Sequence, residues 1–291
     1  MLRTTLVTTA ALADQLGNPD WVIFDCRHDL VNPEWGRAAY AAGHIPGAHF
    51  LHLDRELSGP KQDGNGRHPL PGAAEFAARL AARGVGGQTQ VVAYDAQGGM
   101  VASRLWWMLR WIGHRAVAVL DGGWNQWVAE GRPQSIENPA IDPAAPGRPG
   151  PRSASMAVPH GAAAPVDANH ILSHLGKPGM RLIDARTPDR FRGENETLDP
   201  LGGRIPGAVN RCFRDNLAGE GTFKTAGQLR AEFIGVLDGA SPDEVVHQCG
   251  SGVSACHNIL AMEIAGLPGS RLYPGSWSEW CADPARPVER G

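Results

Sequence analysis

The chain has 291 residues, of which 42% are hydrophobic and 20% charged, a composition typical of a globular protein with room for two domains. Its formal net charge of -3 argues against a nucleic-acid-binding surface, and its apolar stretches are far too short to span a membrane. The five cysteines are odd in number and irregularly spaced, which is typical of neither a disulfide framework nor a zinc site. We therefore expect a cytoplasmic protein with no metal site, no membrane anchor and no nucleic-acid partner.

The first half of the chain alternates short apolar runs with helical patterns. Residues 21–27 form an apolar run that ends in Asp25 and Arg27, which predicts a buried strand with polar groups at its carboxyl end. Two further strands and two helices are predicted, over residues 91–95, 116–120, 73–83 and 103–112. This alternation predicts an α/β fold, with a mainly parallel sheet and helices on both of its faces. In such sheets the active site lies beyond the carboxyl ends of the strands.

Four landmarks of the first half return in the second half in the same order. The pairs are Asp25 and Asp184, the turns GHIPGA at 43–48 and GRIPGA at 203–208, Asp95 and Cys249 after apolar strands, and the segments GGWNQW at 122–127 and GSWSEW at 275–280. Their separations lie between 153 and 160 positions, which indicates a duplicated domain. We expect one domain over residues 1–132 and another over residues 166–291, joined by a linker rich in proline, alanine and glycine at 133–165.

Cys249 is the candidate nucleophile of the second domain. It follows the apolar run at 245–248 and heads a loop of small residues, GSGVS at 250–254, before a predicted helix at 257–264. Small residues let the backbone curl around the sulfur, so that backbone N–H groups and the helix N-terminus favour an anion such as a thiolate. Asp95 stands at the equivalent place in the first domain, which is therefore predicted to be catalytically silent.

The whole pattern resembles the two-domain rhodanese sulfurtransferases, and the resemblance covers nearly the full chain. It rests on the paired Ile-Pro-Gly-Ala turns, the paired Asp-x-Arg strand ends, the paired Gly-x-Trp-x-x-Trp segments and the cysteine loop. The loop CGSGVSA at 249–255 is similar to the CGSGVTA loop of 3-mercaptopyruvate sulfurtransferases, whereas thiosulfate-preferring rhodaneses typically carry basic residues directly after the cysteine. The resemblance implies two tandem rhodanese-like domains and an enzyme that moves a sulfane sulfur from 3-mercaptopyruvate, through a Cys249 persulfide, to an acceptor.

The resemblance also implies roles for individual residues. Cys249 is the persulfide-forming nucleophile, and the family's Ser-His-Asp relay, which protonates the departing pyruvate enolate, is matched by Ser251, His68 and Asp54. Arg190 matches the arginine that holds the donor carboxylate, a task suited to a guanidinium fork. The terminal sulfur is expected to be held by backbone N–H groups of the loop residues Gly250, Gly252, Val253 and Ser254.

One departure from the family concerns a second donor-binding arginine, which 3-mercaptopyruvate sulfurtransferases carry shortly before the second Ile-Pro-Gly turn. Residues 194–202 contain no arginine. Three arginines further along could replace it, and the sequence does not decide among Arg204, Arg211 and Arg214. At the strand ends, Arg27 and Arg186 are expected to pair with carboxylates of their own domains. Most tryptophans are expected in the core or at an interface.

The implied chemistry needs no metal or organic cofactor, and the implied acceptor is a thiol, thioredoxin or cyanide. A thiosulfate-preferring sulfurtransferase on the same scaffold and a non-catalytic sulfur carrier or interaction protein remain alternatives. A cysteine-dependent phosphatase is disfavoured, because its loop needs an arginine about six positions after the cysteine, where Ala255 and Cys256 stand. If the residues between Cys249 and Cys256 were fully helical, roughly 10 Å would separate the two, too far for a disulfide, so a redox role requires a wrapped loop.

Overall fold

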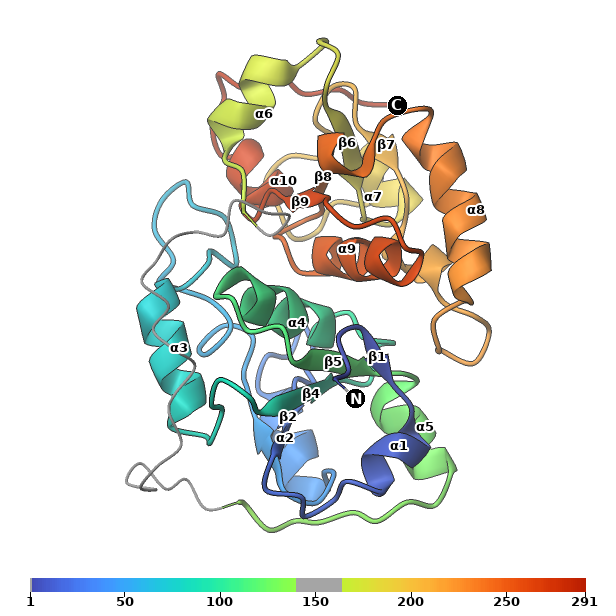
Figure 1. Ribbon diagram of the computed structural model, residues 1–291. Coiled ribbons are helices and arrows are strands. Elements are labelled where there is room, and N and C mark those ends of the chain that lie inside the picture. The colour runs from blue at the N-terminus through green and yellow to red at the C-terminus, as the bar shows by residue number, and fades with distance from the viewer. Residues whose placement is uncertain (1, 140–163) are drawn as a thin grey trace. The chain divides into compact units, whose positions relative to one another are not determined.

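The computed structural model describes residues 2–139 and 164–291, which form two compact units (Figure 1). Among these residues, unit 1 consists of 2–59, 71–139 and 219–223, and unit 2 consists of 60–70, 164–218 and 224–291. Each half of the chain therefore contributes one short segment to the unit that is otherwise built by the other half. Most of the predicted linker, at 140–163, lies outside the described residues.

Unit 1 is built on a five-stranded parallel sheet. Its strands are β1 (Leu6–Val7), β2 (Trp21–Asp25), β3 (Ala48–Phe50), β4 (Gln90–Tyr94) and β5 (Val117–Leu120). They lie in the order β1-β5-β4-β2-β3, and every neighbouring pair is parallel. The register pairs Asp25 with both Phe50 and Tyr94, so the carboxyl ends of β2, β3 and β4 meet at one edge of the sheet.

Helices cover both faces of this sheet, as the full burial of β4 and β5 requires. They are α1 (Thr9–Ala13), α2 (Trp35–Ala42), α3 (Ala73–Ala81), α4 (Ala102–Trp111) and α5 (Gly123–Ala129). Figure 1 shows α4 on one side of the sheet and α1 with α5 on the other. On the second side, Leu12 of α1 and Trp127 of α5 pack in one buried cluster with Ile23 and Val92 of the strands.

Unit 2 repeats this plan with a four-stranded parallel sheet in the order β7-β6-β8-β9. Its strands are β6 (Arg181–Asp184), β7 (Val209–Asn210), β8 (Val245–Gln248) and β9 (Arg271–Leu272). Its helices are α6 (Ala168–His174), α7 (Pro188–Arg192), α8 (Ala226–Leu237), α9 (Ser254–Ile264) and α10 (Ser276–Trp280), with 3-10 turns η1 (Phe213–Asn216) and η2 (Pro242–Glu244). Ile171 of α6 and Trp277 of α10 pack against Leu182 and Val246 in the core.

The predicted α/β architecture, with parallel sheets flanked by helices, is confirmed in both units. The duplicated strand ends also carry the same side-chain arrangement. Arg27 donates through Nε and Nη2 to the Asp25 carboxylate, and Arg186 donates in the same way to Asp184. In both units the guanidinium also donates to a backbone carbonyl that lies 16 or 17 positions further along the chain. The predicted pairing of both arginines within their own domains is therefore confirmed.

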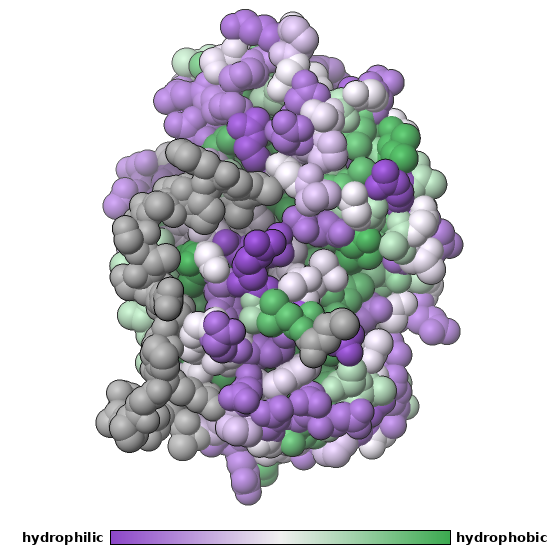
Figure 2. Space-filling model, viewed as in Figure 1, coloured by the Kyte–Doolittle hydropathy of each residue, from purple (hydrophilic) through white to green (hydrophobic). Residues whose placement is uncertain are grey.

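The surface and the core are partitioned as in an ordinary globular fold. Figure 2 shows mostly polar residues on the face in view, with apolar residues in smaller patches. The expected tryptophan core is confirmed for five buried side chains, those of Trp106, Trp107, Trp127, Trp277 and Trp280. In the part of the chain that the structure describes, no helix combines the length and the apolar character needed to cross a membrane.

Candidate active site

Cys249 directly follows β8 and is held by its backbone on both sides. Its N–H donates to Ser276 Oγ at 3.1 Å, and its carbonyl accepts from the Trp277 N–H at 3.0 Å. Only 2% of the residue is exposed. The Gly252 N–H points back to the thiol and donates to Sγ at 3.2 Å. The thiol is therefore nearly buried, and its backbone is fixed on both sides.

The loop after Cys249 can close around the sulfur only because of its glycines. Gly252 has a φ of +75°, and a Cβ there would lie 2.4 Å from the Pro274 carbonyl oxygen. Val253 then precedes α9, which begins at Ser254, three residues before the predicted start at position 257. Further along the helix, the Cys256 thiol donates to the Gly252 carbonyl at 3.3 Å.

The equivalent loop of unit 1 holds an anion of its own. The Asp95 carboxylate is fully buried and accepts hydrogen bonds at 2.7–2.9 Å from the backbone N–H groups of Gln97, Gly99, Val101 and Ala102. Burial raises the pKa of Asp95, and the four backbone donors oppose that rise by stabilising the carboxylate. A strand–loop–helix turn of this construction is therefore an anion cradle, which Asp95 fills in unit 1.

Ser251 and His68, two members of the predicted relay, are in direct contact. Ser251 Oγ lies 2.7 Å from His68 Nδ1, and both residues are about 5% exposed. The segment that carries His68, residues 60–70, belongs to unit 2. This segment packs closely against Gly275 at Gly66, whose φ is +83°. A Cβ at Gly66 would lie 2.9 Å from the Gly275 carbonyl oxygen.

Asp54, the third predicted relay member, belongs to unit 1 and is partly buried there. Its N–H donates to His52 Nδ1 at 3.1 Å, and its carboxylate lies 4.0 Å from the same nitrogen. With His28, these residues bring three metal-binding atoms within 4.8 Å of one another. His52 Nδ1 already accepts a backbone N–H, and the expectation of an enzyme without a metal stays a prediction. The role of Asp54 in the relay stays a prediction.

Arg190 lies beside the cysteine loop, where the resemblance predicted a donor-binding arginine. A Cβ on Gly250 would lie 3.4 Å from each of its terminal nitrogens. Glu196 accepts from Arg190 Nε at 3.1 Å and from Nη2 at 2.8 Å, and the Asp199 carboxylate lies 3.4 Å from Nη2. Two nearly buried carboxylates, 4% and 2% exposed, therefore fix the guanidinium from behind.

The three proposed substitutes for a second arginine have other partners in unit 2. Arg204 pairs with Glu289, and Arg211 donates to Glu232 at 2.5 Å. Arg214 Cζ lies 5.7 Å from the centroid of the Phe213 ring. All three are thus engaged in contacts that serve the fold around them.

Sequence reasoning missed a different arginine, Arg67. A Cβ on Gly250 would lie only 2.8 Å from Arg67 Nη2, closer than either nitrogen of Arg190. Arg67 Nη1 forms an ion pair with Asp199 at 2.5 Å. The one available signal was its place directly before His68, because a residue next to a relay member is carried to the same place.

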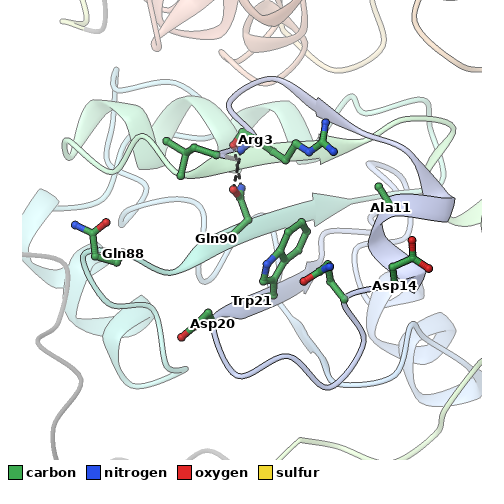
Figure 3. A pocket seen from close by; sticks show the side chains of 9 residues that line it. Arg3, Ala11, Asp14, Asp20, Trp21, Gln88 and Gln90 are labelled. Carbon is green, nitrogen blue, oxygen red and sulfur yellow. Dashed lines mark hydrogen bonds between the residues drawn. The ribbon is translucent and has the colours of Figure 1, made fainter.

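A groove in unit 1 lies at the opposite end of the strands from Asp25 and Asp95 (Figure 3). It is lined by Leu2, Arg3, Ala11, Asp14, Gln15, Asp20, Trp21, Gln88 and Gln90. Trp21 and Gln90 begin β2 and β4, and the Gln90 amide exchanges two hydrogen bonds of 2.9 Å with the backbone of Arg3. The groove has no cysteine or histidine in its lining.

Comparison with known proteins relates both halves of the chain to one family. The model of the rhodanese-like domain matches residues 8–130 and 167–283. A probable 3-mercaptopyruvate sulfurtransferase of Pseudomonas aeruginosa is 45% identical over 100% of both chains. A putative thiosulfate sulfurtransferase of Mycobacterium tuberculosis is 39% identical over 98% of this chain and 97% of its own. The solved structure of the 3-mercaptopyruvate sulfurtransferase from Leishmania major matches with a TM-score of 0.81 and 31% identity, over 95% of this chain and 74% of that one.

Proposed function

The chain belongs to the rhodanese family, and from this premise we propose a sulfurtransferase that moves the sulfane sulfur of 3-mercaptopyruvate, through a persulfide on Cys249, to a thiol, thioredoxin or cyanide. The observation that carries the proposal is the geometry around Cys249. A nearly buried thiol, a backbone donor aimed at its sulfur and the hydrogen bond between Ser251 and His68 occur together. The proposed chemistry uses no metal and no organic cofactor.

The hydrogen bonds of Asp95 in unit 1 support a persulfide at the equivalent Cys249, because the two side chains would place an acceptor at a similar position in their loops. A persulfide extends a cysteine side chain by one atom, so that its terminal sulfur is two bonds from Cβ, as each carboxylate oxygen of aspartate is. The backbone donors of the loop in unit 1 surround such a group at 2.7–2.9 Å. In the second domain, the N–H groups of residues 250–254 are proposed to stabilise the terminal sulfur in the same way.

The reaction takes place in two displacements. The Cys249 thiolate attacks the sulfur of the donor, a sulfur–sulfur bond forms, the carbon–sulfur bond breaks, and pyruvate departs as its enolate. Ser251 donates a proton to the enolate carbon and is reprotonated through His68, with Asp54 proposed to orient the imidazole. The acceptor then attacks the terminal sulfur, and Cys249 is released as a thiolate.

The preference for 3-mercaptopyruvate rests on the loop composition. The residues directly after Cys249 are uncharged, and one of them, Ser251, carries a hydroxyl that forms a hydrogen bond with the His68 imidazole. An enolate leaving group needs a proton, and a sulfite leaving group does not. Thiosulfate remains the second candidate donor, because one of the relatives is named for it.

A reducing, cytoplasmic compartment is part of the proposal. All five cysteines are free and buried, including the nucleophile. Free thiols are the normal state of cysteines in a reducing environment.

The proposal is tested by measuring kcat/KM for 3-mercaptopyruvate and for thiosulfate with one acceptor, together with the mass of the protein after reaction with donor alone. We expect the wild type to gain the mass of one sulfur atom and Cys249→Ser to gain none and lose turnover with both donors. Cys281→Ser is the matched control and should retain both properties. A Cys249→Ser variant with full activity would overturn the proposal.

The relay is tested separately with Ser251→Ala and His68→Ala. We expect each variant to lower kcat with 3-mercaptopyruvate by about 100-fold or more, because general acid catalysis is lost, and to affect thiosulfate far less. An equal loss with both donors would contradict the proton relay and leave the persulfide step intact.

A further inference from the structure

We infer that Ser278 is a positioning residue of the proposed relay, which holds His68 against Ser251 and thereby sets the rate of proton transfer to the departing enolate. This inference rests on the proposed function and deepens it. Ser278 lies in α10, outside the cysteine loop, and is 8% exposed. It acts through hydrogen bonds to the backbone of two other segments of unit 2.

Ser278 is hydrogen-bonded to the residue directly before each of the two relay members. Its N–H donates at 2.9 Å to the carbonyl of Gly250, which precedes Ser251. Its Oγ accepts at 3.0 Å from the N–H of Arg67, which precedes His68. One residue thus joins the two segments whose side chains meet at 2.7 Å, between Ser251 Oγ and His68 Nδ1.

The relay segment, residues 60–70, packs directly on the Ser278 hydroxyl. Gly66 has a φ of +83°, and a Cβ there would lie 3.0 Å from Ser278 Oγ. The hydroxyl donates its hydrogen to the Gly275 carbonyl at 3.2 Å, so that its oxygen is free to accept from the Arg67 N–H. A glycine-containing segment has wide backbone freedom, and such a contact restricts it to one course.

Unit 1 shows the same position without a relay segment bound to it. The counterpart of Ser278, 153 positions earlier, is Asn125, which is exposed and whose amide donates to the Ala96 carbonyl at 3.1 Å. Ala96 is the counterpart of Gly250, so a bond to the loop after the strand is common to both domains. The buried hydroxyl that accepts from the Arg67 N–H belongs to the domain with the nucleophile. The bond to the relay segment therefore accompanies the catalytic loop.

The two bonds of Ser278 have different consequences for the reaction. Loss of the Oγ acceptor releases the Arg67 N–H and with it the backbone that leads into His68, and a displacement of about 1 Å in a reacting group can cost about 100-fold in rate. Loss of the hydroxyl leaves the Ser278 N–H on Gly250, so the loop of Cys249 is retained. A donor whose leaving group needs no proton is therefore insensitive to the hydroxyl.

The test compares Ser278→Ala with the wild type in steady-state assays with both donors. We expect kcat with 3-mercaptopyruvate to fall about tenfold with KM changed less than about twofold, and kcat/KM for thiosulfate to stay within about twofold. Asn125→Ala is the matched control in unit 1 and should match the wild type with both donors. An unchanged kcat with 3-mercaptopyruvate in Ser278→Ala would overturn the inference. So would an equal loss with both donors, which a merely structural role would produce.

A double-mutant cycle identifies the residue through which Ser278 acts. In a His68→Ala background the relay is already lost, so the addition of Ser278→Ala should lower kcat with 3-mercaptopyruvate by less than about twofold. A further tenfold loss in the double variant would overturn the assignment, because Ser278 would then act independently of His68.

Hydrogen exchange separates this inference from the proposed function, because it needs no turnover. We expect the backbone amides of residues 61–68 to exchange about tenfold faster in Ser278→Ala than in the wild type, and Asn125→Ala to leave their exchange unchanged. If the wild type turned over neither donor, the proposed function would fail. Unchanged exchange in Ser278→Ala, in a chain that transfers sulfur, would overturn the role of Ser278 alone.

Discussion

Ser276 adopts a left-handed backbone conformation, with a φ of +54°, although it is not a glycine. Its counterpart in the first domain, 153 positions earlier, is Gly123, with a φ of +56°. The serine is fully buried, and its hydroxyl accepts from the Cys249 N–H and donates to the Tyr273 carbonyl at 2.9 Å. The domain with the nucleophile therefore retains a strained serine where the silent domain has a relaxed glycine.

Two substitutions separate the strain from the hydrogen bond. Ser276→Ala removes the hydroxyl and keeps the Cβ, whereas Ser276→Gly removes both. We expect Ser276→Gly to be more stable than Ser276→Ala by about 1 kcal/mol in urea unfolding, because the left-handed conformation no longer opposes a side chain. Both should lower kcat by about tenfold, because the Cys249 backbone loses one anchor. Equal stability of the two variants would show that the backbone is not strained, and an unchanged kcat would show that the anchor is dispensable.

Individual site residues were predictable to different degrees. Cys249, Ser251 and His68 could be named because the motifs around them are specific, and the contact between Ser251 and His68 is present in the structure. Arg67 could not be identified in the same way. An arginine in a loop rich in glycine and proline has no periodicity, and its approach to Gly250 depends on tertiary contacts between segments 183 positions apart.

At the scale of elements, the segments that were predicted match closely and the parallel α/β arrangement was predicted, but the order of the strands was not. The helix expected at 103–112 is α4 (Ala102–Trp111), and the strand expected at 91–95 is β4 (Gln90–Tyr94). Hydrophobic periodicity determines such elements locally. The strand order and the placement of β1 at the sheet edge depend on which strands pair, and short apolar runs of similar composition do not encode that choice.

The loop between β8 and α9 depends on Gly252 for its course. We expect Gly252→Ala to lower kcat/KM with either donor by about 100-fold, because the methyl group would clash with Pro274 and displace the sulfur cradle by an appreciable fraction of an ångström. Gly235→Ala is the control. Gly235 lies within α8 with no atom within 4 Å of an added Cβ, so this variant should gain about 0.5–1 kcal/mol of stability at unchanged activity. Normal activity of Gly252→Ala would contradict the rigid cradle.

At the scale of the whole molecule, duplication explains most of the fold, whereas the site also depends on residues 60–70, which belong to unit 2. The proposed domain limits at 132 and 166 assign His68 to the first domain. The contacts group residues 60–70 with unit 2, where His68 meets Ser251. The repeat in the sequence could not predict this grouping, because a repeat relates only residues that are equivalent in the two domains. Residues 60–70 supply side chains that only unit 2 uses.

The stability of the molecule should fall in mild acid, partly because of His247 in the centre of β8. Burial lowers the pKa of His247 to about 3, so the folded chain keeps this imidazole neutral where an unfolded chain would protonate it. Its stabilising contribution is fully present above the ordinary histidine pKa of about 6.5 and is lost as the pH falls from there toward 3, since the unfolded state then binds the extra proton. Between pH 7 and pH 5 this loss amounts to about 2 kcal/mol.

His247→Leu should remove that part of the pH dependence. Leucine is apolar and of similar size, and it does not titrate, so we expect the free energy of unfolding in urea to fall by about 2 kcal/mol less between pH 7 and pH 5 than in the wild type. Met262→Leu is the matched control, because Met262 Sδ lies 3.1 Å from His247 Nε2 and carries no proton. Its loss of stability over the same interval should equal that of the wild type. If His247→Leu also matched the wild type, the acid sensitivity would have to come from other groups, and the neutral imidazole would contribute nothing to it.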